Sequence, residues 1–316
     1  MSEVAIELDG QYRALREEAG AAVRKRGFVS VGGPDAAEYV QGQVTNDVEA
    51  IEPGKGAYSA LLDRKGRMQA DMRILRTTDG FRIGVEPEAL AAVVRHLTMY
   101  SVGRDVTVED HTGSLALISI VGPASAELAG LAPLGWENDH AEDRIDGIEV
   151  LSIRTDLGLD LVVAAEDSER TLEALAARGI AQVTEDALEI VRVESGRPRH
   201  GREMTQETIP QEAGINERAV SFTKGCYIGQ ETVARLHYKG KPNRHLRGLE
   251  LSKPCEPGAL VTLGERELGR IGSVVVSPGL GSIALAILRR EAEPGSDVSI
   301  EGGIDARVVD LPFRSE

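Results

Sequence analysis

The most informative stretch of this sequence is Lys224-Gly225-Cys226-Tyr227-Ile228-Gly229-Gln230-Glu231. Its two glycines allow the backbone to approach a partner closely, and its cysteine lies near a lysine. We expect Cys226 to lie between Lys224 and the first turn of a helix that runs on to Arg235, so that exposed amides and Lys224 would both favour thiolate over thiol. The alternative is that Cys226 is a small buried side chain at a tight turn.

A run of positive side chains follows this stretch, consisting of Arg235, His237, Lys239, Lys241, Arg244, His245 and Arg247. The whole chain has 51 acidic and 36 basic residues and a net charge of -15. A basic island in an acidic protein favours a small, flexible anion over a long polyanion, and an oligocarboxylate tail would suit it. The alternative is a solvated face of a connector between domains.

Two carboxylates earlier in the chain are candidates for binding or catalysis. Asp71 interrupts a strand-like stretch from Met68 to Leu75, and strict alternation places it on one face with Gln69 and Arg73. The plain interpretation is a solvent-facing carboxylate paired to Arg73. The alternative is a carboxylate in a cleft that anchors an amine or stabilises positive charge in a transfer reaction.

The second carboxylate, Glu194, ends an apolar-periodic helix over 187–195, just before a loop over 196–201 that glycines and a proline keep irregular. A carboxylate there could accept two hydrogen bonds from a planar N–C–N edge, such as that of a pterin or guanine. Equally, a glutamate at a helix end could simply face solvent.

Composition excludes several classes of protein. A length of 316 residues favours two or three domains, and 41% apolar with 28% charged residues is typical of globular chains. No apolar run reaches the length of a membrane span, and two cysteines give no disulfide framework, so we expect a cytoplasmic protein. GxSxG, HExxH and Walker motifs are absent, which argues against ordinary hydrolases and kinases, and we expect no protein-only metal site.

The pattern of predicted elements indicates an α+β protein. A strand–helix unit opens the chain, a β-meander covers 58–85, and a helix with one apolar face starts at Pro87. A second α/β subdomain is expected at about 113–185. From about residue 246, short β segments separated by Gly or Pro predict a small barrel or sandwich.

The octapeptide at 224–231 closely resembles the defining motif of the YgfZ-type folate-binding proteins. The resemblance extends to Val40-Gln41-Gly42-Gln43-Val44-Thr45-Asn46-Asp47-Val48, to Tyr58–Asp63 with Gly66-Arg67, and to Ile209-Pro210-Gln211-Glu212-Ala213-Gly214, and so covers nearly the whole chain. These proteins are relatives of the glycine-cleavage T-protein, the tetrahydrofolate-dependent aminomethyltransferase. The resemblance implies a clover of three subdomains with a ferredoxin-like middle part and a C-terminal β-barrel, divided as a folate-binding unit over 1–240 and a barrel over 241–316.

The resemblance also implies a function. The protein would bind tetrahydrofolate, or a one-carbon derivative of it, and support iron–sulfur cluster assembly or repair through Cys226, with Lys224 beside it and iron–sulfur client or assembly proteins as partners. Asp71 matches the catalytic carboxylate of the aminomethyltransferases, and Glu194 matches their pterin-binding glutamate. The remaining residues assigned to cofactor binding are Tyr58, Gln230, Glu231 and Arg235.

Two other functions stay open. The first is a true aminomethyl or one-carbon transferase that uses Asp71, because many YgfZ-type proteins lack Asp71, Glu194 or both, whereas this chain has them. The second is a tRNA-modification factor that presents residues 224–247 to RNA. The net charge of -15 makes tRNA an unlikely partner.

Overall fold

The computed structural model describes residues 3–313. The chain forms two compact units. The first unit contains the residues before Asp63 together with Gln69–Leu188 and Arg218–Ile228, and the second contains Asp63–Met68, Glu189–Glu217 and the residues from Gly229 onward. The chain therefore passes between the two units several times.

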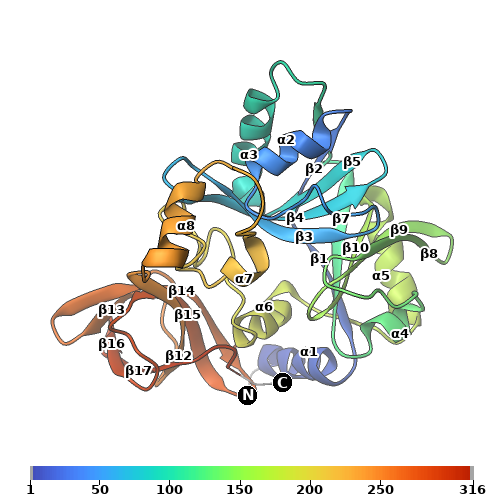
Figure 1. Ribbon diagram of the computed structural model, residues 1–316. Coiled ribbons are helices and arrows are strands. Elements are labelled where there is room, and N and C mark those ends of the chain that lie inside the picture. Colours follow the sequence, from blue (N-terminus) through green and yellow to red (C-terminus); the bar gives the residue numbers. More distant parts are fainter. Residues whose placement is uncertain (1–2, 314–316) are drawn as a thin grey trace. The chain divides into compact units, whose positions relative to one another are not determined.

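The first sheet of the first unit has five strands in the order β3-β4-β5-β2-β6. Helices α2 and α3 pack on one face of it, where both contribute buried residues to a single apolar core (Figure 1). Pro87 starts α3, at a position where a missing N–H costs nothing. The bounds are β2 Gly27–Gly32, α2 Ala36–Gln43, β3 Gly56–Leu62, β4 Met68–Thr77, β5 Gly80–Val85, α3 Pro87–Tyr100 and β6 Thr107–Asp110.

The turn between β4 and β5 requires a glycine. Gly80 has φ +150°, and a Cβ there would lie 2.1 Å from the carbonyl oxygen of Val31 on the neighbouring strand. Only a residue without a side chain fits between these backbones. The sequence therefore specifies the β-meander at its tightest point.

The second sheet of the first unit has six strands in the order β11-β1-β7-β10-β9-β8. Three strands (β8, β9 and β10) lie between helices α4 and α5. Without β8, which is added at the edge beside β9, the order β7, α4, β9, β10, α5, β11 is the predicted ferredoxin-like pattern, with β1 inserted between β11 and β7. The bounds are α1 Glu3–Glu17, β1 Gly20–Arg24, β7 Leu115–Val121, α4 Ser125–Ala129, β8 His140–Ile145, β9 Ile148–Arg154, β10 Gly158–Ala164, a 3₁₀ turn Ala165–Asp167, α5 Ser168–Ala177 and β11 Ala181–Gln182.

The two sheets of the first unit share an apolar layer. Phe28 and Leu75 come from the first sheet, and they cluster with four buried residues of the second, Leu117, Leu151, Ile153 and Val162. Burial of such side chains contributes roughly 1.5–3 kcal/mol each relative to exposure. The layer therefore makes the two sheets one body and sets the position of the polar side chains at their margins.

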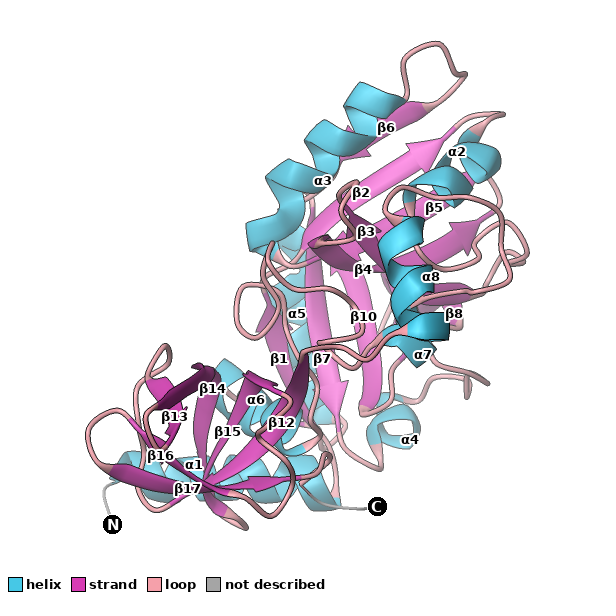
Figure 2. Ribbon diagram, turned by 60° about the vertical axis from the view of Figure 1, so that its left-hand side comes forward, coloured by secondary structure: helices cyan, strands magenta, loops and turns pink. Residues whose placement is uncertain are grey.

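The second unit contains a closed six-stranded barrel in the order β12-β15-β14-β13-β16-β17 (Figure 2). The sequence left a barrel and a sandwich open, and the pairing of β17 with β12 makes it a barrel. Helix α8 precedes it, and helices α6 and α7 lie where the chain passes between units. The bounds are α6 Glu185–Glu194, α7 Asn216–Ala219, α8 Gln230–Lys239, β12 Arg244–Leu251, β13 Leu260–Leu263, β14 Arg266–Ser277, β15 Gly281–Arg289, β16 Asp297–Ile300 and β17 Ile304–Val309.

The barrel begins at Arg244, but the predicted domain boundary between residues 240 and 241 stays a prediction. Among the described residues, no helix combines the length and the apolar character that crossing a membrane requires.

Candidate functional site

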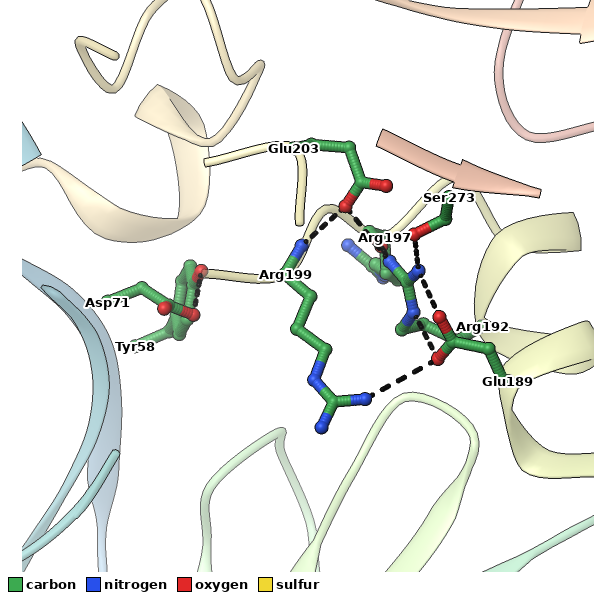
Figure 3. A network of polar contacts seen from close by, with 8 residues as sticks. All are labelled: Tyr58, Asp71, Glu189, Arg192, Arg197, Arg199, Glu203 and Ser273. Atoms are coloured by element: carbon green, nitrogen blue, oxygen red, sulfur yellow. Dashed lines mark hydrogen bonds and ion pairs between the residues drawn. The ribbon is translucent and has the colours of Figure 1, made fainter. Parts of the chain in front are cut away.

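Asp71 and Tyr58 form a hydrogen-bonded pair on the adjacent strands β4 and β3. The Tyr58 hydroxyl donates to Asp71 Oδ2 at 2.8 Å, as Figure 3 shows. Burial, followed by the negative charge of Asp71 and this hydrogen bond, raises the pKa of Tyr58 well above its ordinary value. Tyr58 therefore keeps its proton and acts as a donor that orients the carboxylate.

The plain interpretation of Asp71, a pair with Arg73, is wrong. Burial along β4 alternates as predicted, so Gln69, Asp71 and Arg73 do share a face. Arg73, however, bonds Asp160 Oδ2 at 2.6 Å and the Asn138 side-chain oxygen at 3.0 Å. The guanidinium that the sequence offered to Asp71 is therefore engaged on the neighbouring sheet.

Asp160 itself is a structural carboxylate. Its second oxygen accepts a hydrogen bond from Ser119 at 2.6 Å. Burial alone would raise its pKa, but Arg73 and Ser119 outweigh burial, and the pKa of Asp160 lies below its ordinary value. A charged Asp160 thus holds Arg73 in place.

Arg218 is a site residue that the sequence interpretation missed. Its guanidinium lies over the Tyr58 ring, 4.9 Å from the centroid, and forms an ion pair with Glu137. Burial would lower the pKa of Arg218, but Glu137 more than compensates and the pKa is raised. Its Nε is buried without a hydrogen-bond partner among residues 3–313. Its place shortly before the motif at 224–231 was the available signal.

Cys226 precedes helix α8, as predicted, but the helix does not begin directly after it. Helix α8 begins only at Gln230, after a left-handed Gly229 with φ +85°. Cys226 is exposed, so the alternative of a small buried side chain is wrong. The helix amides expected to favour its thiolate are therefore not adjacent to it.

Lys224 does not lie free beside the thiol either. It is 8% exposed, and its ammonium donates to three main-chain carbonyl oxygens, those of Gln41 at 2.7 Å, Val44 at 2.8 Å and Asn46 at 2.7 Å. Burial lowers the pKa of Lys224 to about 8. All three ammonium protons are thus engaged by backbone, and its predicted catalytic role stays a prediction.

Glu194 is buried, and the expectation that it could simply face solvent is wrong. It is 1% exposed at the end of α6, and one carboxylate oxygen accepts a hydrogen bond from the Ser277 hydroxyl. The Ser277 oxygen in turn accepts from the amides of Gly279 at 3.1 Å and Leu280 at 3.0 Å. Helix α6 and the end of β14 together fix the direction of this carboxylate.

A buried ionic network is centred on Arg192, which lies on the same helix as Glu194 (Figure 3). Arg192 donates to both oxygens of Glu189, at 2.6 and 2.8 Å, and to the Ser273 hydroxyl at 2.6 Å. Glu203 accepts from Arg192 at 3.3 Å and from the amide of Arg199 at 3.0 Å. The network ties the 196–201 loop to α6 and β14, so this loop is anchored by its own unit.

Gln230, Glu231 and Arg235, three more residues assigned to cofactor binding, lie on α8, in the second unit with Glu194. Gln230 is half-buried, whereas Glu231 and Arg235 are exposed. Most of the basic run is exposed too, although Arg247 donates to the Ala292 carbonyl at 3.0 Å. Tyr58, Asp71, Lys224 and Cys226 belong to the first unit.

The predicted site residues lie away from a hollow at one end of the first sheet. This hollow, of about 280 Å³ near Gly33, Arg76 and Asp79, contains none of them. Within residues 3–313, no group of three or more His, Cys, Asp or Glu side chains is arranged to hold a metal ion.

Comparison with known proteins identifies the family. Residues 7–224 match the GCVT N-terminal domain, and residues 244–314 match the glycine cleavage T-protein C-terminal barrel domain. The chain is 29% identical to an aminomethyltransferase of Rubrobacter xylanophilus over 321 residues, covering 97% of this chain and 86% of that protein. An aminomethyltransferase of Listeria welshimeri is 26% identical over 324 residues, covering 97% and 89%.

A solved structure, that of glycine cleavage system aminomethyltransferase T from Bartonella henselae, has the same fold. Its TM-score is 0.86 with 22% identity, over 97% of this chain and 89% of that one. The similarity confirms the predicted α+β, T-protein-like fold class. Because both domain models together span nearly all of the sequence, the chain belongs to the glycine cleavage T-protein family, among aminomethyltransferase-like proteins.

Proposed function

We propose that this protein binds tetrahydrofolate or a one-carbon derivative of it. The observation that carries the proposal is the buried Glu194 carboxylate, which accepts a hydrogen bond from Ser277. A buried carboxylate pairs strongly with two neighbouring N–H donors on one edge of a ring, and a pterin offers such an edge. The Glu194 carboxylate thus fits the N–H edge of a pterin ring.

The glutamyl tail of the folate would meet the basic run. Arg235, Lys239, Lys241 and Arg244 are exposed in the same unit as Glu194. Their charges would attract carboxylates while the net charge of -15 repels longer polyanions, including tRNA. Gln230 and Glu231, at the start of α8, are assigned to the same ligand.

We further propose that the protein supports assembly or repair of iron–sulfur clusters in client proteins, with Cys226 as the functional thiol. An exposed cysteine is accessible to a partner, and a thiolate is a soft ligand for iron. The other cysteine, Cys255, is half-buried, and burial followed by Glu256 raises its pKa. The greater exposure of Cys226 supports it as the reactive thiol. The cytoplasmic location of the protein stays a prediction.

The Tyr58–Asp71 pair favours a second function, folate-dependent transfer of an aminomethyl or other one-carbon unit. Bound tetrahydrofolate would supply the amines that accept or release that unit. Asp71 would stabilise positive charge that develops on an amine, while Tyr58 holds the carboxylate in one orientation. The unsatisfied Nε of Arg218, over the Tyr58 ring, gives this margin a donor for a bound polar group.

One experiment tests folate binding and turnover together. The purified protein is titrated by calorimetry with tetrahydrofolate and with its methylene and formyl forms, each with one and with several glutamates, and product formation is followed with a small amine acceptor. Binding that tightens with glutamate number supports the pterin and tail assignments. Absence of binding to every form would reject them, and turnover would favour the transferase.

A further inference from the structure

The ammonium of Lys224 lies in a socket at the carboxyl end of α2. Gln41 belongs to the last turn of that helix, Val44 caps it, and Asn46 follows in the next loop. Carbonyls at a helix end lack intrahelical partners and carry partial negative charge, which favours a cation there. The socket therefore binds Lys224 through backbone that no substitution of a single side chain removes.

Charged and aromatic groups around the socket add to this binding. Asp47 and Glu49 both act to raise the pKa of Lys224, opposing burial. The Tyr227 ring lies 5.3 Å from the lysine nitrogen, within the range of a cation–π contact. Lys224 and Tyr227 are thus buried together.

Three more hydrogen bonds join the same two segments. Thr45 Oγ1 donates to the carbonyl of Ala219 at 2.6 Å, the Asn46 side chain donates to the carbonyl of Arg218 at 3.0 Å, and the Ser221 amide donates to the carbonyl of Thr45 at 3.0 Å. The segments at 45–46 and 218–221 are therefore joined, although more than 170 positions separate them in the sequence.

Cys226 and Gly225 together form an exposed tip in the segment that contains Lys224. Lys224 and Tyr227 are buried, whereas Gly225 and Cys226 between them are exposed. Regular structure resumes only at Gln230. The buried side chains of Lys224 and Tyr227 therefore fix the backbone on both sides of Gly225 and Cys226.

We propose that Lys224 is a positioning residue, which fixes the Gly225–Cys226 tip by anchoring its amino-terminal side in the α2 socket, and does not exchange protons with the thiol. The functional meaning of this anchor rests on the proposed role of Cys226, but the anchor itself is measurable without that role. Its loss would free the tip while the sheets and their apolar cores remain intact.

The test compares Lys224→Met, Lys224→Arg and the control Lys25→Met, an exposed lysine of the same unit. Amide exchange at Ser221 reports the anchor, and the alkylation rate of Cys226 relative to Cys255 reports the tip. We expect Lys224→Met to speed Ser221 exchange about tenfold or more, because three buried carbonyls lose their donor. We expect its Cys226 to Cys255 ratio to change at least about twofold, and Lys224→Arg, which keeps a cation with several donors, to recover most of both effects.

Exchange and alkylation in Lys224→Met equal to those of Lys25→Met would overturn the proposal. If Lys224→Met does not fold, the wild-type protein still decides the question, since an ammonium held by three carbonyls gives a slowly exchanging ¹⁵N signal and a fast-exchanging one would refute the anchor. Repeating the exchange measurement in Cys226→Ala separates the two proposals. Protection unchanged there supports the anchor even if that variant rescues iron–sulfur enzymes, an outcome that would reject only the role of the thiol.

Discussion

Tyr58 donates its phenolic hydrogen bond to Asp71 at 2.8 Å, across the two neighbouring strands β3 and β4. The raised pKa of Tyr58 keeps that donor in place throughout the neutral range. Since Arg73 is held by Asp160 instead, Asp71 is oriented by a neutral hydroxyl and not by that guanidinium. Asp71 is therefore suited to a role in catalysis, whereas Asp160 has a structural role.

Asp71→Asn is expected to reduce any one-carbon transfer by about 10²- to 10⁴-fold, because it removes a charged group that would act on the reacting amine. Stability should change little, since an amide oxygen can still accept from Tyr58. Turnover and thermal unfolding measure the two effects. Asp160→Asn is the matched control, and it should lower the free energy of unfolding by about 1–3 kcal/mol by weakening the partner of Arg73. Full turnover in Asp71→Asn would remove Asp71 from the mechanism.

Glu194→Gln is expected to weaken folate binding by about 1–3 kcal/mol, roughly 5- to 150-fold, because one of the two pterin donors would face an N–H group. The amide oxygen can still accept from Ser277, so thermal stability should be nearly unchanged. Calorimetry checks the affinity. Glu250→Gln, the same change at an exposed position of β12, should bind like the wild type. Equal affinity in the two variants would reject the assignment of Glu194.

Cys226→Ala is expected to bind folate normally and to lose rescue of iron–sulfur enzyme activity in cells that lack the protein. The side chain is exposed, so its removal leaves no cavity and should not lower the melting temperature. Cys255→Ala should rescue fully. Rescue by Cys226→Ala to the level of Cys255→Ala contradicts the proposed thiol.

The ammonium of Lys224 should titrate near pH 8, well below its ordinary value of 10.5, because burial disfavours the charged form. Below pH 8 the folded and unfolded chains both hold the proton. Between about 8 and 10.5 only the unfolded chain holds it, so the free energy of unfolding, relative to Lys224→Met, should rise with pH in that window. A ¹⁵N titration of Lys224 gives the midpoint, and a value at or above 10.5 would show that the socket outweighs burial.

Local patterns predicted much of the fold. Alternation along β4 placed Asp71 on one face with Gln69 and Arg73, and the β-meander predicted over 58–85 forms strands β3, β4 and β5. The short β segments near the carboxyl end form the barrel. These features follow from patterns within short segments of the chain, and such patterns are visible in a single sequence.

Partners distant in sequence could not be predicted in the same way. Asp160 lies 87 positions from Arg73, and the carbonyls that bind Lys224 lie 178–183 positions before it. Charge and spacing along the chain suggested Asp71 for Arg73 and Cys226 for Lys224. Folding instead satisfied each cation with the acceptors that the sheets and the end of α2 brought near, because a buried cation without acceptors is costly.

Closure of the barrel has a consequence for self-association. Every strand from β12 to β17 has a neighbour on both sides, so the barrel has no edge strand. In contrast, β3, β6, β8 and β11 end the two open sheets. Among residues 3–313, a partner that docks by adding to an edge strand therefore finds those edges in the two sheets of the first unit.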